Sequence, residues 1–135
     1  MPEIEYIEDS METQELLDSL SPPVRNWFMD KFPDFTEPQK IAIPRIMRGE
    51  HLLLCSPTGS GKTLTAFLSI IDDLVRRSLD GSLPDTVQCV YISPIKALAN
   101  DIQKNLIGPL TEIMERFLPS RAKDIKVGLR TGDTP

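Results

Sequence analysis

Residues 52–63 read Leu52-Leu53-Leu54-Cys55-Ser56-Pro57-Thr58-Gly59-Ser60-Gly61-Lys62-Thr63. The apolar run at the start predicts a strand, the two glycines predict a tight turn, and the residues after Lys62 have helical spacing. A strand, a glycine-rich turn and a helix form the setting of a phosphate-binding P-loop. The sequence therefore predicts a loop that holds the phosphates of a nucleoside triphosphate.

Each residue type in this loop suits phosphate chemistry. Gly59 and Gly61 permit a close backbone approach, and the following helix directs its N–H groups at the anion. Lys62 is predicted to reach the β- and γ-phosphates, and the Thr63 hydroxyl is predicted to ligate Mg²⁺. Ser56 stands where the strict pattern has glycine, a position that needs only a small residue. The alternative is an ordinary glycine-rich turn. The predicted nucleotide-binding residues are Ser56, Pro57, Thr58, Gly59, Ser60, Gly61, Lys62 and Thr63, with Lys62 and Thr63 also catalytic.

Composition is that of one globular domain, with 40% hydrophobic and 26% charged residues. Seven acidic residues and no basic residue lie in the first 18 positions, whereas residues 25–135 hold 15 basic and 13 acidic residues. The net charge of −5 therefore belongs to the N-terminal segment. No apolar run is long enough to span a bilayer, and we expect a cytoplasmic protein. Cys55 and Cys89 are predicted to be free, buried thiols, and His51 has no partner for a metal site.

Capping residues, prolines and glycines divide the rest of the chain. Ser21 and Thr36 are predicted to cap two helices, and Pro44 is expected to bend the second helix or end it early. Asp72-Asp73 is predicted to lie solvated on the polar face of the P-loop helix. The predicted helices cover residues 22–32, 37–48, 62–77, 95–107 and 110–118, with Gly108-Pro109 separating the last two.

Strands are predicted at residues 51–55, 87–92 and 125–130, and the nearly all-apolar strand 87–92 is expected to be buried on both faces. Strands that alternate with helices predict right-handed parallel βαβ units and an α/β fold. Ligands of such sheets bind at the carboxyl ends of the strands. We therefore expect the loops at 56–63, 93–97 and 131–134 to meet at one edge.

Together these loops resemble the first motor domain of a superfamily 2 helicase. Phe35-Thr36-Glu37-Pro38-Gln39 resembles the adenine-reading Q motif, in which the glutamine amide donates to and accepts from the adenine edge. Without that pattern, a lone Gln39 is more often a solvated helix residue. The resemblance implies that Gln39 contacts the nucleotide and makes Phe35 a candidate to stack on the adenine.

Two later segments resemble the nucleic-acid loops of these helicases. Residues 93–101 resemble motif Ia, in which Pro94, Lys96 and Ala97 would contact the sugar-phosphate backbone, although Lys96 could also be a solvated lysine. The loop after the third strand would add contacts from Arg130, Thr131, Gly132 and Thr134. The combination is similar to the large-helicase-related (Lhr-type) branch, which is akin to the Ski2-like helicases.

The resemblance implies a RecA-like parallel sheet flanked by helices, with ATP and Mg²⁺ as cofactors. Residues 1–20 would form an acidic leader or helix, and residues 21–135 the N-terminal part of the ATP-binding domain. The family's D-E-x-H box is missing from these 135 residues. We therefore expect a piece of a longer helicase, inactive alone, whose partners are the rest of the helicase and single-stranded or duplex nucleic acid, DNA ahead of RNA. The alternatives are a translocase that does not separate strands and a nucleotide-binding module without hydrolysis.

Overall fold

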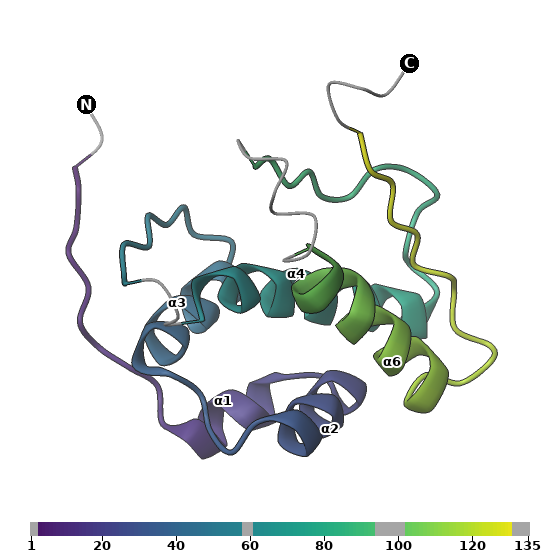
Figure 1. The fold of residues 1–135 in the computed structure, drawn as a ribbon, viewed down its shortest axis with the longest axis horizontal. Helices are drawn as coiled ribbons and strands as arrows, with labels where there is room; N and C mark the ends of the chain where they lie inside the picture. Colours follow the sequence, from purple (N-terminus) through teal and green to yellow (C-terminus); the bar gives the residue numbers. More distant parts are fainter. Residues whose placement is uncertain (1–2, 58–60, 94–101, 131–135) are drawn as a thin grey trace.

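The computed structural model describes residues 3–57, 61–93 and 102–130. Figure 1 shows short helices joined by long extended segments. No β-strand is formed within these described residues. The helices are α1 (Thr13–Ser19), α2 (Pro22–Lys31), α3 (Glu37–Met47), α4 (Lys62–Asp80), the π-helix η2 (Gln103–Ile107) and α6 (Gly108–Arg116).

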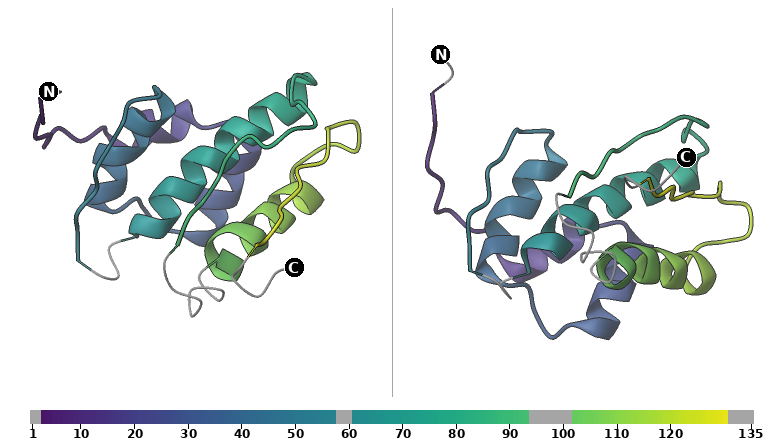
Figure 2. Two further views of the ribbon diagram at one scale, coloured as in Figure 1. Left: turned by 90° about the horizontal axis from the view of Figure 1, so that it is seen from above. Right: turned by 45° about the horizontal axis from the view of Figure 1, so that its top comes forward.

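Helix α4 lies at the centre of the structure and packs against α2, α3 and η2. Helices α1 and α2 lie along one side of α4, and residues 84–93 run along the opposite side (Figures 1 and 2). The extended residues 124–130 follow α6, and Lys126 Nζ lies 3.8 Å from a carboxylate oxygen of Asp85. The P-loop helix is therefore covered mainly by other helices.

The core contains the apolar stripe of α4 that the sequence predicts. Phe67, Leu68, Ile71 and Val75 are almost completely buried, which places this face of α4 against α2 and α3. Buried side chains from α1, α2, α3 and α6 join the same cluster, and Leu106 of η2 packs against it. Its other buried members are Leu16, Leu20, Val24, Trp27, Phe28, Phe35, Ile43, Leu64, Leu83, Leu110, Ile113 and Ile125.

Helix α3 continues through Pro44 to Met47, so this proline does not end the helix early. Proline has no N–H, which leaves the carbonyl of Lys40 without its partner one turn later. The backbone N–H of Met11 donates to that carbonyl at 3.1 Å. The N-terminal segment thus completes the hydrogen bonding of α3.

Gly108-Pro109 does not separate two helices, which corrects the sequence expectation. The π-helix η2 runs directly into α6, and the Gly108 N–H donates to the carbonyl of Gln103. A π-turn is wider than an α-turn, so it accommodates a proline that would clash within a regular α-helix. Residues 102–116 therefore form one continuous helical segment.

The predicted strands are extended segments without sheet pairing among the described residues. Val87, Val90 and Ile92 are 72–85% exposed, so the expectation that residues 87–92 are buried on both faces is wrong for this structure. Leu53 in the first predicted strand is also 86% exposed. A strand becomes buried only when neighbouring strands pair with it and helices cover both faces. Among the described residues these segments lie unpaired. Tyr91 contacts the core through its ring, whose centroid lies 4.7 Å from that of the Phe67 ring.

The cysteine expectation is also wrong in part. Cys55 and Cys89 are free thiols, as predicted, but both are exposed, because each lies in one of these unpaired segments. Partial burial still raises the pKa of the Cys89 thiol above its ordinary value of 9.0.

Asp72 is 2% exposed, contrary to the expectation of a solvated pair, whereas Asp73 is exposed. One carboxylate oxygen of Asp72 accepts the backbone N–H of Ser21 at 2.7 Å and its hydroxyl at 2.8 Å. The other oxygen accepts from Nε of Arg76 at 2.8 Å. Asp72 thus ties the start of α2 to α4.

Candidate nucleotide-binding site

The P-loop residues that the structure describes lie at the N-terminal end of α4. Gly61 is the N-cap of this 19-residue helix and has a φ of +83°. A residue with a Cβ is strained in this left-handed conformation, so glycine suits the turn. Lys62 is the first helical residue and is exposed. The helix thus presents its free N–H groups and a lysine at one place, a combination that fits a phosphate group.

The carbonyl of Gly61 anchors the loop to two neighbouring elements. It accepts the N–H of Thr65 at 3.0 Å and the Thr65 hydroxyl at 2.7 Å, both from within α4. It also accepts from Nε2 of Gln39 at 3.4 Å, which comes from α3. The predicted Q-motif glutamine and the P-loop are therefore in direct contact.

Gln39 belongs to a capping box at the start of α3. Its backbone N–H donates to Oγ1 of Thr36 at 3.4 Å, and its Oε1 accepts the Thr36 N–H at 2.9 Å. The predicted cap at Thr36 is confirmed. Such a reciprocal pair fixes the first helical turn. Gln39 is 4% exposed, so its amide is held between α3 and Gly61.

The approach of Gln39 to Gly61 means that a side chain at Gly61 would displace the Gln39 amide. A Cβ added to Gly61 would lie 2.6 Å from Nε2 of Gln39. Close approach and backbone conformation therefore both require glycine at this position. This is the tightest packing between the predicted adenine-reading residue and the phosphate loop.

The other predicted nucleotide-site residues are partly accounted for. Ser56 and Thr63 are half-buried, and Pro57 is exposed. Thr58, Gly59 and Ser60 lie outside the described residues. Among the described residues, no group of three or more His, Cys, Asp or Glu side chains could hold a metal ion. The assignment of Thr63 as a Mg²⁺ ligand stays a prediction.

Phe35 lies in the hydrophobic core and is 5% exposed. Its ring stacks on that of Phe28, with 4.0 Å between the ring centroids and an interplanar angle of 12°. One ring face is therefore already covered. Stacking of Phe35 on an adenine stays a prediction, and it requires the opposite ring face.

The residues predicted to contact nucleic acid lie almost entirely outside the described part of the chain. Pro94, Lys96 and Ala97 belong to this group, as do Thr131, Gly132 and Thr134. Arg130 is described and exposed, at the end of the segment 124–130. These assignments therefore remain predictions.

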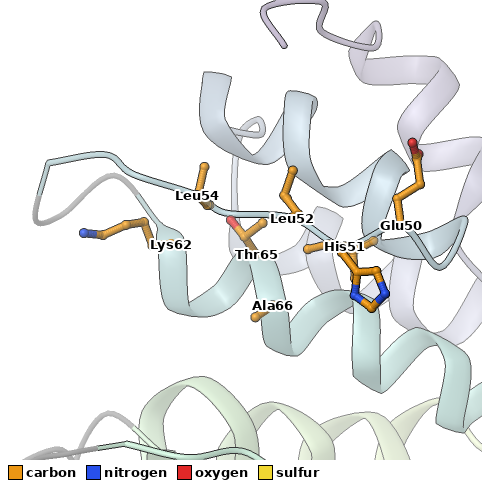
Figure 3. A pocket seen from close by; sticks show the side chains of 8 residues that line it. Glu50, His51, Leu52, Leu54, Lys62, Thr65 and Ala66 are labelled. Carbon is orange, nitrogen blue, oxygen red and sulfur yellow. The ribbon is translucent and has the colours of Figure 1, made fainter. Parts of the chain in front are cut away.

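A cavity of about 400 Å³ lies between the C-terminal end of α3, residues 50–54 and α4. Figure 3 shows Leu52 and Leu54 above Thr65 and Ala66, with Lys62 and His51 at opposite ends. The Lys62 side chain extends from the start of α4 away from His51. Its ammonium group thus lies outside the apolar part of the cavity.

Comparison with known proteins identifies a family. The sequence pattern described as DEAD/DEAH box helicase matches residues 36–129. A protein of Methanocaldococcus jannaschii, "ATP-dependent helicase Lhr-Core", is 42% identical over 99% of this chain and 16% of its own length. The Methanothermobacter thermautotrophicus protein of the same name is 54% identical over 85% of this chain and 14% of its own length.

A bacterial protein is also similar. The Escherichia coli protein "Lhr helicase/uracil glycosylase" is 42% identical over 89% of this chain and 8% of its own length. The chain thus spans less than a fifth of the length of these relatives. No solved structure matches it. In the part of the chain that the structure describes, none of the helices is long and apolar enough to cross a membrane.

Proposed function

This chain belongs to the DEAD/DEAH box helicase family and is of the Lhr type, and we propose that it supplies the ATP-binding part of a motor that moves along nucleic acid and separates its strands. The observation that carries this proposal is the contact between Gln39 and Gly61. It joins a candidate adenine-reading amide to a candidate phosphate loop. This contact supports an ATP site in which the two candidate halves are adjacent.

ATP binding would use the described residues as follows. The N–H groups at the start of α4 and the Lys62 ammonium hold the β- and γ-phosphate oxygens. The Thr63 hydroxyl ligates Mg²⁺, which when bound neutralises charge on those oxygens. The Gln39 amide, already fixed against the loop, contacts the adenine. These residues bind and orient the nucleotide.

Hydrolysis needs groups that these 135 residues lack. An Asp-Glu pair that holds Mg²⁺ and positions water does not occur in the sequence. We propose that further parts of a longer polypeptide supply this pair and a second motor domain. Residues 1–135 alone would then bind ATP weakly and hydrolyse none.

The nucleic-acid contacts would come from residues that follow the predicted strands. Lys96 and the N–H groups near Pro94 and Ala97 are suited to phosphate oxygens, as are Thr131, Gly132, Thr134 and Arg130. Such contacts hold the sugar-phosphate backbone without reading bases. We propose DNA ahead of RNA as the nucleic acid that is bound. The extended segments 51–55, 87–92 and 125–130 would pair in a RecA-like parallel sheet within the longer protein.

The test uses the full-length protein that contains this chain. We expect its ATP hydrolysis to rise when single-stranded DNA or RNA is added, and a tailed duplex to be separated. Lys62→Ala should lower stimulated hydrolysis at least about 100-fold, because the phosphate-binding ammonium is lost. Lys31→Ala, remote from the loop, is the matched control. Stimulated hydrolysis without strand separation would instead identify a translocase, and an absence of hydrolysis would refute the proposal.

A further inference from the structure

We propose that Thr36 is a positioning residue that sets the preference for adenine over guanine by fixing the orientation of the Gln39 amide. The inference rests on the proposed ATP site and names how that site distinguishes bases. Thr36 itself lies one residue before α3 and would act through Gln39.

The two chain groups that face the amide of Gln39 have opposite characters. Oε1 lies 2.9 Å from the N–H of Thr36, which can only donate a hydrogen bond. Nε2 lies 3.4 Å from the carbonyl of Gly61, which can only accept one. A flipped amide would place its oxygen against the carbonyl and its NH₂ against the N–H. Both contacts would then be repulsive, so the chain itself selects one orientation.

The selected orientation leaves one donor and one acceptor available. An amide oxygen has two lone pairs and an amide nitrogen has two hydrogens, and Thr36 and Gly61 use one of each. The remaining lone pair and hydrogen match adenine, which presents its N6 amino group beside the N7 acceptor. Guanine presents the O6 acceptor beside N7, so the fixed Oε1 of Gln39 would face another acceptor.

Selectivity therefore depends on how strongly the flip is prevented. A freely rotating Gln39 amide could turn its NH₂ toward O6 of guanine and accept GTP. The Thr36 N–H opposes that rotation directly, and the Thr36 hydroxyl opposes it indirectly by holding the Gln39 N–H at 3.4 Å. Burial of Gln39 at 4% exposure means that water cannot replace these partners without rearrangement.

Substitution of Thr36 separates its two contributions. The backbone of Thr36 has φ −76° and ψ 161°, which proline adopts without strain. Thr36→Pro removes both the N–H and the hydroxyl, Thr36→Ala removes the hydroxyl only, and Thr36→Ser keeps both. We therefore expect selectivity to fall in a graded order from serine through alanine to proline.

The experiment measures competition of ATP and GTP for a fluorescent ADP analogue bound to the full-length protein. The dissociation constant for GTP divided by that for ATP should fall about 3- to 10-fold in Thr36→Pro, since the hydrogen bond that directly opposes the amide flip is lost together with the hydroxyl contact. It should fall about 2- to 3-fold in Thr36→Ala and stay within error in Thr36→Ser. If Thr36 had only a structural role, its substitution would weaken the binding of ATP and GTP equally and leave the ratio of their dissociation constants unchanged.

The matched control is Glu12→Pro, which introduces proline at the N-cap of α1. Glu12 has the same kind of extended backbone, with φ −61° and ψ 145°. The ratio of GTP to ATP dissociation constants in Glu12→Pro should equal that of the unmodified protein. If Thr36→Pro does not fold, as judged by circular dichroism, the Thr36→Ala ratio decides.

Two results would overturn the inference. An unmodified protein that binds ATP and GTP equally would do so, and so would an unchanged ratio in the Thr36 variants. Failure of the proposed helicase function is a separate result, because it would appear as absent hydrolysis or strand separation. The binding ratio does not depend on either.

Discussion

Replacing the buried Asp72 by alanine is expected to be among the most destabilising single changes in this chain. The carboxylate joins α4 to the start of α2 and accepts three hydrogen bonds, from the Ser21 N–H, the Ser21 hydroxyl and Arg76. Ser21 is 3% exposed, so its donors find no water when the carboxylate is removed. The prolines at 22 and 23 carry no N–H, which makes Ser21 the principal donor at this helix start.

The expected magnitude follows from the burial of each partner. Leaving two buried donors unsatisfied costs about 1–3 kcal/mol each, and Asp72→Ala should therefore lower the free energy of unfolding by about 2–6 kcal/mol. Asp72→Asn keeps an acceptor for Ser21 and should cost about 1–2 kcal/mol. The Arg76 side chain is 47% exposed. Water screens its ion pair with Asp72, so Arg76→Ala should cost only about 0–1 kcal/mol.

The assay is urea-induced unfolding of residues 1–135, followed by the emission of Trp27, the only tryptophan. Asp73→Ala, at the exposed neighbouring carboxylate, is the matched control and should change stability by less than about 0.5 kcal/mol. The reasoning is refuted if Asp72→Ala and Asp73→Ala have equal stabilities. It is also refuted if Arg76→Ala costs as much as Asp72→Ala, since the ion pair would then dominate.

Three further predictions concern the nucleotide site and the packing of α2 against α6. Gly61→Ala should abolish detectable ATP binding in a fluorescent-nucleotide titration, because the new Cβ would lie 2.6 Å from Nε2 of Gln39 and the φ of +83° disfavours alanine. Acidification should loosen the α2–α6 contact. Hydrogen bonds from Lys31 first, and then from Trp27, lower the pKa of Glu112 below its ordinary value of 4.5. The stability from this contact is therefore complete above pH 4.5 and is lost as the pH falls through the lowered pKa, which a Trp27 fluorescence titration would follow. Trp27→Phe should remove the 3.0 Å hydrogen bond to Glu112 and lower the urea midpoint, measured by circular dichroism.

The sequence contained enough information to locate the helices and the candidate nucleotide site. Apolar residues at helical spacing predicted the buried face of α4, and the Thr36 cap predicted where α3 begins. These signals are local, because spacing and capping act within a few residues of one another. The contact between Gln39 and Gly61 was not predicted, since it depends on how α3 packs against α4.

The remaining misses involve partners that are distant in sequence. Val87–Ile92 has the composition of a buried strand, yet a strand requires neighbours that its own residues cannot supply. Asp72 was predicted to be solvated because Asp72-Asp73 was assigned to the polar face of the helix. One signal was available: Asp72 follows the buried Leu68 by four residues, which places both on one side of α4. The π-turn before Gly108 has no comparable sequence signal.

The hydrogen bond from Met11 to the Lys40 carbonyl marks a practical boundary for protein engineering. A tag fused near residue 3 adjoins an exposed segment and should leave this bond intact. An expression start at Thr13 would discard the donor and leave the Lys40 carbonyl open beside Gln39. Trimming the acidic N-terminus to improve crystallisation would thus alter the helix that carries the candidate adenine-reading side chain, and Met11 should be kept in any shortened version.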